Sequence, residues 1–185
     1  MRGTHKRVFL ITGPEATGTK LVTRILLAAG CHGDAGNDQW IERAMHDNLT
    51  FECSPIVLRL SMPCGLVWHK IDDVLWHLKS LGYYEMRVIV TSRCWYATGR
   101  SQTKNGTHAV SLQHSENKRR RAYEEIYSSL KFFDEVPHCL VTYEALLMRP
   151  QSVMEWLLDW CGLPMPEADK LPTVRDENGK WYQEK

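Results

Sequence analysis

Residues Arg7 to Gly30 read RVFLITGPEATGTKLVTRILLAAG, and this stretch decides the fold that the sequence predicts. The run from Val8 to Thr12 is apolar and rich in β-branched residues, which indicates a buried parallel strand. Residues 19–29 carry apolar side chains on one face and are followed by glycine, which is typical of a helix. The loop between them, GPEATG, has glycine at both ends. A strand, a glycine-bounded loop and a helix in this order are expected to aim backbone N–H groups and a helix N-terminus at an anion.

The kind of anion is suggested by the residues around the second glycine of the loop. We expect a phosphate or phosphosulfate cradle that opens at Gly13 and is formed by Thr17, Gly18, Thr19 and Lys20. The ATP-type loop has the pattern G-x-x-x-x-G-K-[ST], whereas here the hydroxyl precedes the lysine. The lysine is therefore one helical position late for reaching a β- or γ-phosphate. A plain strand-to-helix turn is the alternative, but it needs neither the two hydroxyls nor the lysine.

Composition limits the classes of function. With 185 residues, the chain is long enough for one domain with a substantial core, and residues 166–185 are expected to form an irregular tail. The formal net charge of +1 favours neither nucleic acid nor a membrane as partner. No apolar run spans a membrane and no signal peptide is evident, so a cytoplasmic protein is expected. Six cysteines without a C-x-x-C pair favour buried free thiols over a zinc site.

The rest of the chain alternates apolar strands with helices. Strands are expected at 56–60, 87–91 and 139–142, a loop at 31–38, and helices at 39–48, 71–81, 95–104, 118–133, 143–147 and 151–161. Such alternation predicts a three-layer α/β/α fold with a central parallel sheet. Ligands of such folds bind beyond the carboxyl ends of the strands. The loop after the first strand should therefore meet residues 61–69 and 92–101.

Two further motifs follow the later strands. Arg93 comes directly after the third strand, and Ser101 follows eight residues on. A guanidinium can bind two oxygens of one phosphate and a helix hydroxyl can bind a third. A surface salt bridge and an ordinary helix position are the alternatives for these two residues taken singly. After the fourth strand come Thr142-Tyr143-Glu144-Ala145-Leu146, then Pro150 and Trp160-Cys161-Gly162-Leu163.

With these motifs in this order, the chain resembles the sulfotransferases that use 3′-phosphoadenosine 5′-phosphosulfate (PAPS), over roughly residues 8–163. The resemblance implies a P-loop-like fold in which Thr17-Gly18-Thr19 hold the 5′-phosphosulfate, and Arg93 with Ser101 holds the 3′-phosphate. It implies transfer of a sulfuryl group to a hydroxyl or amine of a small-molecule or carbohydrate acceptor. The segment Asn178-Gly179-Lys180 is loosely similar to a C-terminal contact of that family with the 3′-phosphate.

No metal is expected in this reaction. ATP-using P-loop enzymes have a strand that ends in aspartate and organises Mg²⁺, whereas the third strand here ends in Ser92-Arg93. A sulfuryl group carries less charge than a phosphoryl group, so hydrogen-bond donors and lysine can stabilise its transfer.

Two positions depart from the family pattern and leave the catalytic residues open. Ala16 stands where many members have a lysine, so Lys20 or Lys104 would have to replace it. Ser61 stands where the cytosolic branch has a catalytic histidine, and an unassisted serine is a poor general base. Arg59 is expected to bind the donor sulfate or an acidic acceptor, or else to form a structural ion pair. The candidates for the base are Glu42, Glu52 and His69, each with an ordinary solvated role as its alternative.

Two other functions remain open at this point. The first is a nucleoside or small-molecule kinase that binds ATP at residues 13–20. The second is a non-catalytic nucleotide-binding relative that has kept the cradle. The acceptor and the oligomeric state cannot be read from the sequence.

Overall fold

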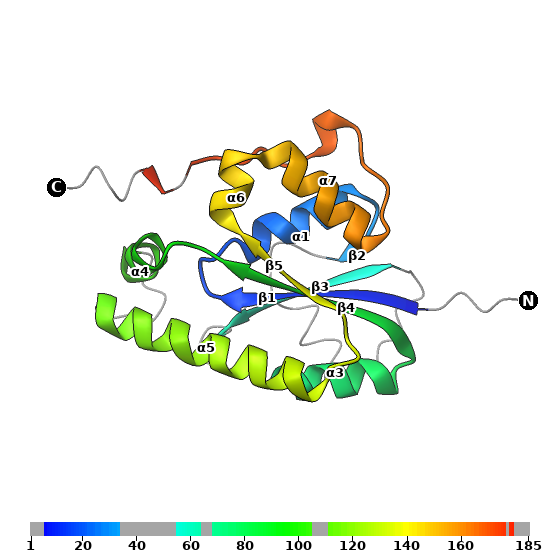
Figure 1. Cartoon of the computed structure of the whole chain (residues 1–185), viewed down its shortest axis with the longest axis horizontal. Helices are drawn as coiled ribbons and strands as arrows, with labels where there is room; N and C mark the ends of the chain where they lie inside the picture. Colours follow the sequence, from blue (N-terminus) through cyan, green and yellow to red (C-terminus); the bar gives the residue numbers. More distant parts are fainter. Residues whose placement is uncertain (1–5, 34–54, 64–67, 105–110, 177, 180–185) are drawn as a thin grey trace, which may run out of the picture.

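The computed structural model describes residues 6–33, 55–63, 68–104, 111–176 and 178–179. Its centre is a five-stranded sheet with the order β2-β3-β1-β4-β5, in which every neighbouring pair is parallel. The strands are β1 (Lys6–Pro14), β2 (His32–Gly33), β3 (Ile56–Met62), β4 (Tyr83–Ser92) and β5 (His138–Thr142). Helices cover both faces of the sheet (Figure 1). The predicted three-layer α/β/α class is confirmed.

The helices divide between the two faces of the sheet. They are α1 (Thr19–Ala28), α3 (Ile71–Ser80), α4 (Trp95–Lys104), α5 (Leu112–Phe132), α6 (Tyr143–Met148) and α7 (Pro150–Cys161), and a 3₁₀ turn η1 (Ala168–Lys170) follows. Helices α3 and α5 pack on one face, where Val8 and Leu10 point. Helices α1, α6 and α7 pack on the other, where Phe9 and Ile11 point. Both faces of β1 are buried, which explains why its sequence is a continuous apolar run.

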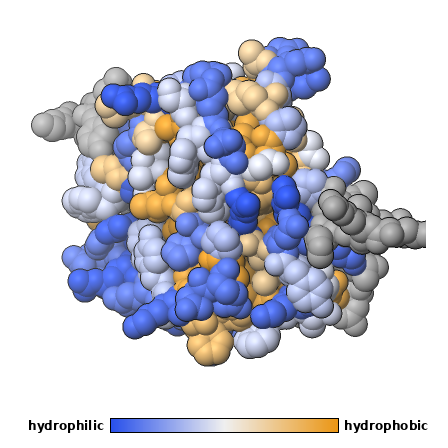
Figure 2. All heavy atoms as spheres, turned by 45° about the vertical axis from the view of Figure 1, so that its right-hand side comes forward, coloured by the Kyte–Doolittle hydropathy of each residue, from blue (hydrophilic) through white to orange (hydrophobic). Residues whose placement is uncertain are grey.

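The register of the sheet places the functional loops at one edge. Thr12 of β1 pairs with Leu60 of β3 and with Val90 of β4, so the three strands end level with one another. In Figure 1 these carboxyl ends lie on the left, beside α4 and the C-terminal tail. Figure 2 brings the opposite side forward, where hydrophilic residues flank a central band of apolar ones.

Several boundaries differ from the predicted ones. Helix α5 begins at Leu112, six residues before the predicted start at 118, because Ser111 caps it by accepting a hydrogen bond from the backbone N–H of His114. Its first turns are polar and carry no apolar stripe for a sequence pattern to detect. Strand β2 lies within the predicted loop at 31–38, since backbone pairing with β3 needs no side-chain pattern. The predicted helix at 39–48 lies outside the described residues.

The cysteines that the structure describes are free thiols. Cys31 and Cys161 are buried, while Cys94 and Cys139 are half-buried. Burial raises the pKa of Cys31, Cys139 and Cys161 to about 12. These thiols therefore stay protonated, as expected of packing residues.

Within the described part of the chain, no helix has the length and apolar composition that crossing a membrane requires.

Candidate functional site

A pocket of about 970 Å³ opens at the carboxyl end of the sheet. Its described walls come from five parts of the chain: the loop after β1 with the start of α1, the end of β3, the residues after β4, the start of α6, and the tail. The residues that line it are Glu15, Ala16, Gly18, Thr19, Lys20, Leu21, Arg24, Arg59, Ser61, Arg93, Ser101, Tyr143, Pro172, Thr173 and Arg175. The sheet thus brings together most of the side chains that the sequence motifs predicted to meet.

Helix α1 begins at the floor of this pocket. Gly18 precedes it with φ +99° and ψ 12°, a left-handed conformation that glycine adopts without strain. The backbone oxygen of Gly18 accepts hydrogen bonds from Leu21 and Val22 at 3.0 and 3.1 Å. No side chain described in the structure caps α1, and its first turn contains no acidic residue. The positive end of the helix dipole is therefore directed at the pocket, and no carboxylate in the first turn of α1 neutralises it.

Thr17 lies under the loop and does not line the pocket. Its hydroxyl is 2.6 Å from the Pro14 oxygen, to which it donates, and 2.7 Å from the Thr91 hydroxyl. The side chain of Thr91 also donates to the backbone oxygen of Thr12 at 3.3 Å. This buried set of hydroxyls ties the loop to the ends of β1 and β4. Thr17, named above as a cofactor-binding candidate, is placed where it shapes the loop.

Gly13 is required by the close approach of the loop to β4. Its φ is +154°, and a Cβ atom built on it would lie 2.6 Å from the backbone oxygen of Thr91. Gly30 also has a positive φ, +96°, but a Cβ atom there would meet no heavy atom within 4 Å. Both glycines therefore have a positive φ, but only Gly30 has room for a Cβ atom.

We expect Gly13→Ala to lower the free energy of unfolding by roughly 3–4 kcal/mol, because a buried overlap with backbone adds to the positive-φ strain. Gly30→Ala, which carries the strain alone, should cost about 1 kcal/mol. Urea unfolding of the two variants and the unchanged chain measures this difference. Equal losses would show that the overlap is relieved by a shift of β4.

The end of β3 contributes a hydrogen-bonded group of polar side chains. The hydroxyls of Thr19 and Ser61 are 3.1 Å apart, and Nη1 of Arg59 donates to the Ser61 hydroxyl at 3.3 Å. Ser61 is 6% exposed. A hydroxyl that already accepts from a guanidinium is poorly suited to take up a proton. Ser61 and Arg59 thus form a donor-rich wall, and neither has the chemistry of a general base.

Arg93 and Ser101 both line the pocket. The guanidinium of Arg93 lies over the ring of Tyr143, with 4.6 Å to the ring centroid. Its Nη1 donates to the backbone oxygen of Ala16 at 3.3 Å, and its Nε donates to Oδ1 of Asn178 at 2.6 Å. Three different elements therefore hold this side chain in one orientation.

The remaining sequence candidates are placed as follows. Lys20 is exposed at the pocket, whereas Lys104 at the end of α4 and the half-buried His69 do not line it. Glu42 and Glu52 lie outside the described residues. The basic run at 118–121 does not line the pocket either.

Sequence reasoning missed three charged residues of the pocket: Glu15, Arg24 and Arg175. Arg24 could have been found, because it follows Lys20 by one helical turn and so shares its face of α1. Arg175 lies in the tail, where no pattern indicates which residue turns inward. Glu15 occupies a loop position that the motif leaves unspecified.

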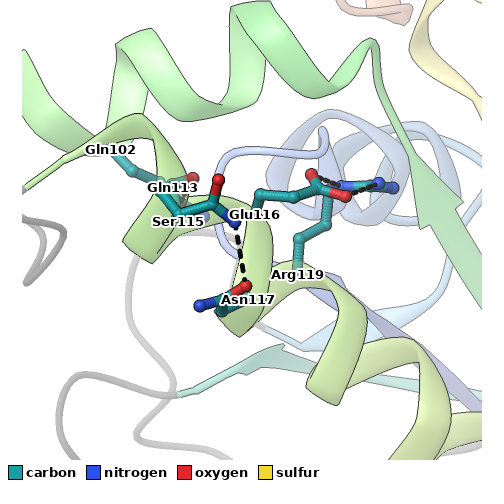
Figure 3. A network of polar contacts seen from close by, with 6 residues as sticks. All are labelled: Gln102, Gln113, Ser115, Glu116, Asn117 and Arg119. Atoms are coloured by element: carbon teal, nitrogen blue, oxygen red, sulfur yellow. Dashed lines mark hydrogen bonds and ion pairs between the residues drawn. The ribbon is translucent and has the colours of Figure 1, made fainter.

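The backbone of Glu15 is fixed by a buried amide. Nε2 of Gln102 on α4 donates to the Glu15 oxygen at 2.8 Å, and Oε1 of Gln102 accepts from the hydroxyl of Ser115 on α5. Figure 3 shows Gln102 and Ser115 side by side; Gln113 and Asn117 of α5 are hydrogen-bonded nearby, as are Glu116 and Arg119. The loop is thus attached to two helices as well as to the sheet.

The charges around the pocket favour a polyanion. Among the described residues, five cationic side chains and one carboxylate line it; the cations are Lys20, Arg24, Arg59, Arg93 and Arg175. A concave surface of one sign attracts ligands of the opposite sign. Among the described residues, no three His, Cys, Asp or Glu side chains gather as a possible metal site.

No protein-family model matches this chain, and no curated protein matches it in sequence. Among solved structures, the fold is similar to the sulfotransferase domain from the Synechococcus PCC 7002 olefin synthase. The TM-score is 0.58 and the identity 16%, and the match covers 97% of this chain and 82% of that one. At this identity the likeness is evidence of fold. The chain therefore has a sulfotransferase-like fold, with a cation-lined pocket at the edge of the sheet where such folds bind their ligands.

Proposed function

We propose that this protein is a PAPS-dependent sulfotransferase, which moves a sulfuryl group from PAPS to a hydroxyl or amine of a small-molecule or carbohydrate acceptor. The observation that carries the proposal is the meeting of two anion-binding features in one pocket of a sulfotransferase-like fold. One is the N-terminus of α1 with Thr19 and Lys20, and the other is Arg93 with Ser101.

The two features are assigned to the two ends of the donor. The 5′-phosphosulfate binds at the first N–H groups of α1 and at the side chains of Thr19 and Lys20. The 3′-phosphate, with about two negative charges, binds Arg93 and Ser101. A nucleotide with phosphates at both ends matches a pocket whose described lining has five cationic side chains and one carboxylate.

In the reaction, the acceptor oxygen or nitrogen forms a bond to sulfur as the bond between sulfur and the 5′-phosphate oxygen breaks. The electron pair of that broken bond leaves on the 5′-phosphate of adenosine 3′,5′-bisphosphate (PAP). Lys20 and Arg59 stabilise the negative charge on the sulfuryl and leaving oxygens, because both are cationic donors that line the pocket. Lys20 thereby supplies the positive charge that a lysine at the position of Ala16 provides in many sulfotransferases.

The proton of the acceptor needs a base, and Glu15 is our proposal for it. It is the one carboxylate among the described residues that line the pocket. Its backbone N–H donates to the Met62 oxygen at 3.3 Å, so it lies beside the end of β3, the strand after which the cytosolic sulfotransferases have their catalytic histidine. Gln102 holds its backbone from the other side.

The test is thermal unfolding of the full chain with PAP. At a PAP concentration about 100 times Kd, binding to the folded state alone adds about 2.7 kcal/mol of stability. For a chain of this size, we expect Tm to rise by roughly 5–10 °C. Adenosine 5′-phosphate, which lacks the 3′-phosphate, should give a smaller rise. An unchanged Tm in millimolar PAP would refute the proposal, and a rise with ATP only in the presence of Mg²⁺ would favour the kinase.

A further inference from the structure

The C-terminal segment of residues 171–176 and 178–179, called the strap here, lies along the pocket. Leu171 and Val174 pack against the apolar cluster beneath α1 and α7, and the hydroxyl of Tyr143 donates to the backbone oxygen of Arg175. Pro172 and Thr173 line the pocket together with Arg175. The strap is therefore a wall of the site, although residues 171–176 contain no strand or helix.

One side chain of the strap is buried, and it is polar. Asn178 is 8% exposed, whereas its neighbours Arg175 and Asp176 are exposed. The carboxylate of Asp176 accepts from the backbone N–H groups of Asn178 and Gly179 at 2.9 and 3.0 Å. This turn directs the amide of Asn178 inward. A buried amide costs free energy unless both of its ends are hydrogen-bonded.

Both ends of the Asn178 amide are hydrogen-bonded. Oδ1 accepts from Nε of Arg93 at 2.6 Å, and Nδ2 donates to Oε1 of Glu144 at 3.0 Å. The same oxygen of Glu144 accepts from the backbone N–H of Cys94 at 2.9 Å. Only a side chain that accepts at one end and donates at the other can join a guanidinium to a carboxylate in this way.

These hydrogen bonds help to fix the orientation of the Arg93 side chain. The bond to Asn178 fixes its Nε edge, the Ala16 oxygen fixes Nη1, and the Tyr143 ring supports its face. A guanidinium binds phosphate best when its planar set of donors is oriented in advance. The amide of Asn178 thus links the guanidinium of Arg93 to the carboxylate of Glu144.

We propose that Asn178 is a positioning residue that orients Arg93 and thereby sets the preference of this site for nucleotides with a 3′-phosphate. The inference rests on the proposed function, since it assigns the 3′-phosphate to Arg93. It goes further by making the strap a determinant of donor selectivity through a residue that need not touch the donor.

The experiment compares the Kd values of PAP and adenosine 5′-phosphate by titration calorimetry on the full chain. The ratio of these values measures the preference for the 3′-phosphate. For Asn178→Ala we expect the ratio to fall about tenfold, the effect of about 1.4 kcal/mol, with little change in the affinity for adenosine 5′-phosphate. Asn178→Asp is the second variant, because it keeps the size of the side chain. Its carboxylate would pair with Arg93 and repel Glu144, so the ratio should fall at least as far.

Gln151→Ala is the matched control, since it removes an exposed amide on α7 that donates to Oε1 of Glu155 and does not line the pocket. It should leave the ratio unchanged. If the unchanged chain binds PAP and adenosine 5′-phosphate equally well, the pocket has no site for the 3′-phosphate, and the proposed function is refuted. A clear PAP preference that survives in both Asn178 variants would overturn the positioning role alone. Equal weakening of both nucleotides would likewise overturn it, because it would mark Asn178 as a purely structural residue.

Discussion

Arg93→Ala is expected to weaken PAP binding about a hundredfold or more. The variant loses at least two charge-assisted hydrogen bonds to the proposed 3′-phosphate, each on the order of 1.5–3 kcal/mol. The rise of Tm with PAP should then nearly vanish at concentrations that saturate the unchanged chain. Affinity for adenosine 5′-phosphate should fall much less, because that nucleotide lacks the group that Arg93 binds.

Arg93 also contacts Asn178, Ala16 and Tyr143 within the protein, so its loss can affect the fold. Thermal unfolding without ligand measures that effect separately. Arg93→Lys keeps the charge but not the planar fork, and an intermediate loss of about tenfold is expected. Arg120→Ala is the control, since Arg120 is exposed on α5 and does not line the pocket. If folded Arg93→Ala protein binds PAP as tightly as the unchanged chain, the 3′-phosphate must lie elsewhere.

The meeting of Lys20, Arg93 and Ser101 could be predicted because the topology of the sheet determines it. Strands that are buried on both faces are apolar throughout, so they stand out in the sequence, and their alternation with helices requires a parallel sheet. In a parallel sheet every strand ends at the same edge. The position of a motif just after a strand was therefore enough to place these three side chains at one pocket.

The direction of individual side chains within the loop could not be predicted. Thr17 and Thr19 both flank Gly18, yet only Thr19 faces the pocket while Thr17 packs against Thr91. The difference arises from the backbone of the loop, where Ala16 has a φ of +66° that the sequence does not suggest for a non-glycine residue. A motif names the residue types of such a loop but not which hydroxyl turns inward.

The side-chain directions in the tail could not be predicted from the sequence either. Its polar sequence predicts irregular structure, but it does not indicate that Asn178 is buried and bonded to Arg93. Contacts of this kind depend on where a segment without periodicity crosses the folded body. The local turn at Asp176 that directs Asn178 inward is common in loops and marks no function by itself.

Glu15→Gln is expected to lower kcat by about 10²–10³-fold while leaving the Kd of PAP nearly unchanged, since a positioned general base typically contributes 10²–10⁴-fold. The amide has the size of the carboxylate but cannot take the acceptor proton at neutral pH. Turnover is measured with radiolabelled PAPS and a panel of phenols, alkyl alcohols, amines and hexoses. The best acceptor of that panel then serves for all variants. If no member of the panel is sulfated while PAP binds, the protein is the non-catalytic nucleotide-binding relative.

Comparing kcat with the Kd of PAP separates loss of the base from a general distortion of the loop, because a distorted loop would also bind PAP more weakly. Glu155→Gln is the matched control, being an exposed glutamate on α7 outside the pocket. Ser61→Ala should lower kcat only about tenfold, since Ser61 supports Thr19 and Arg59 by hydrogen bonds and takes no proton. Undiminished turnover in Glu15→Gln would exclude Glu15 as the base. The search would then return to Glu42, Glu52 and His69, starting with the two glutamates because His69 does not line the pocket.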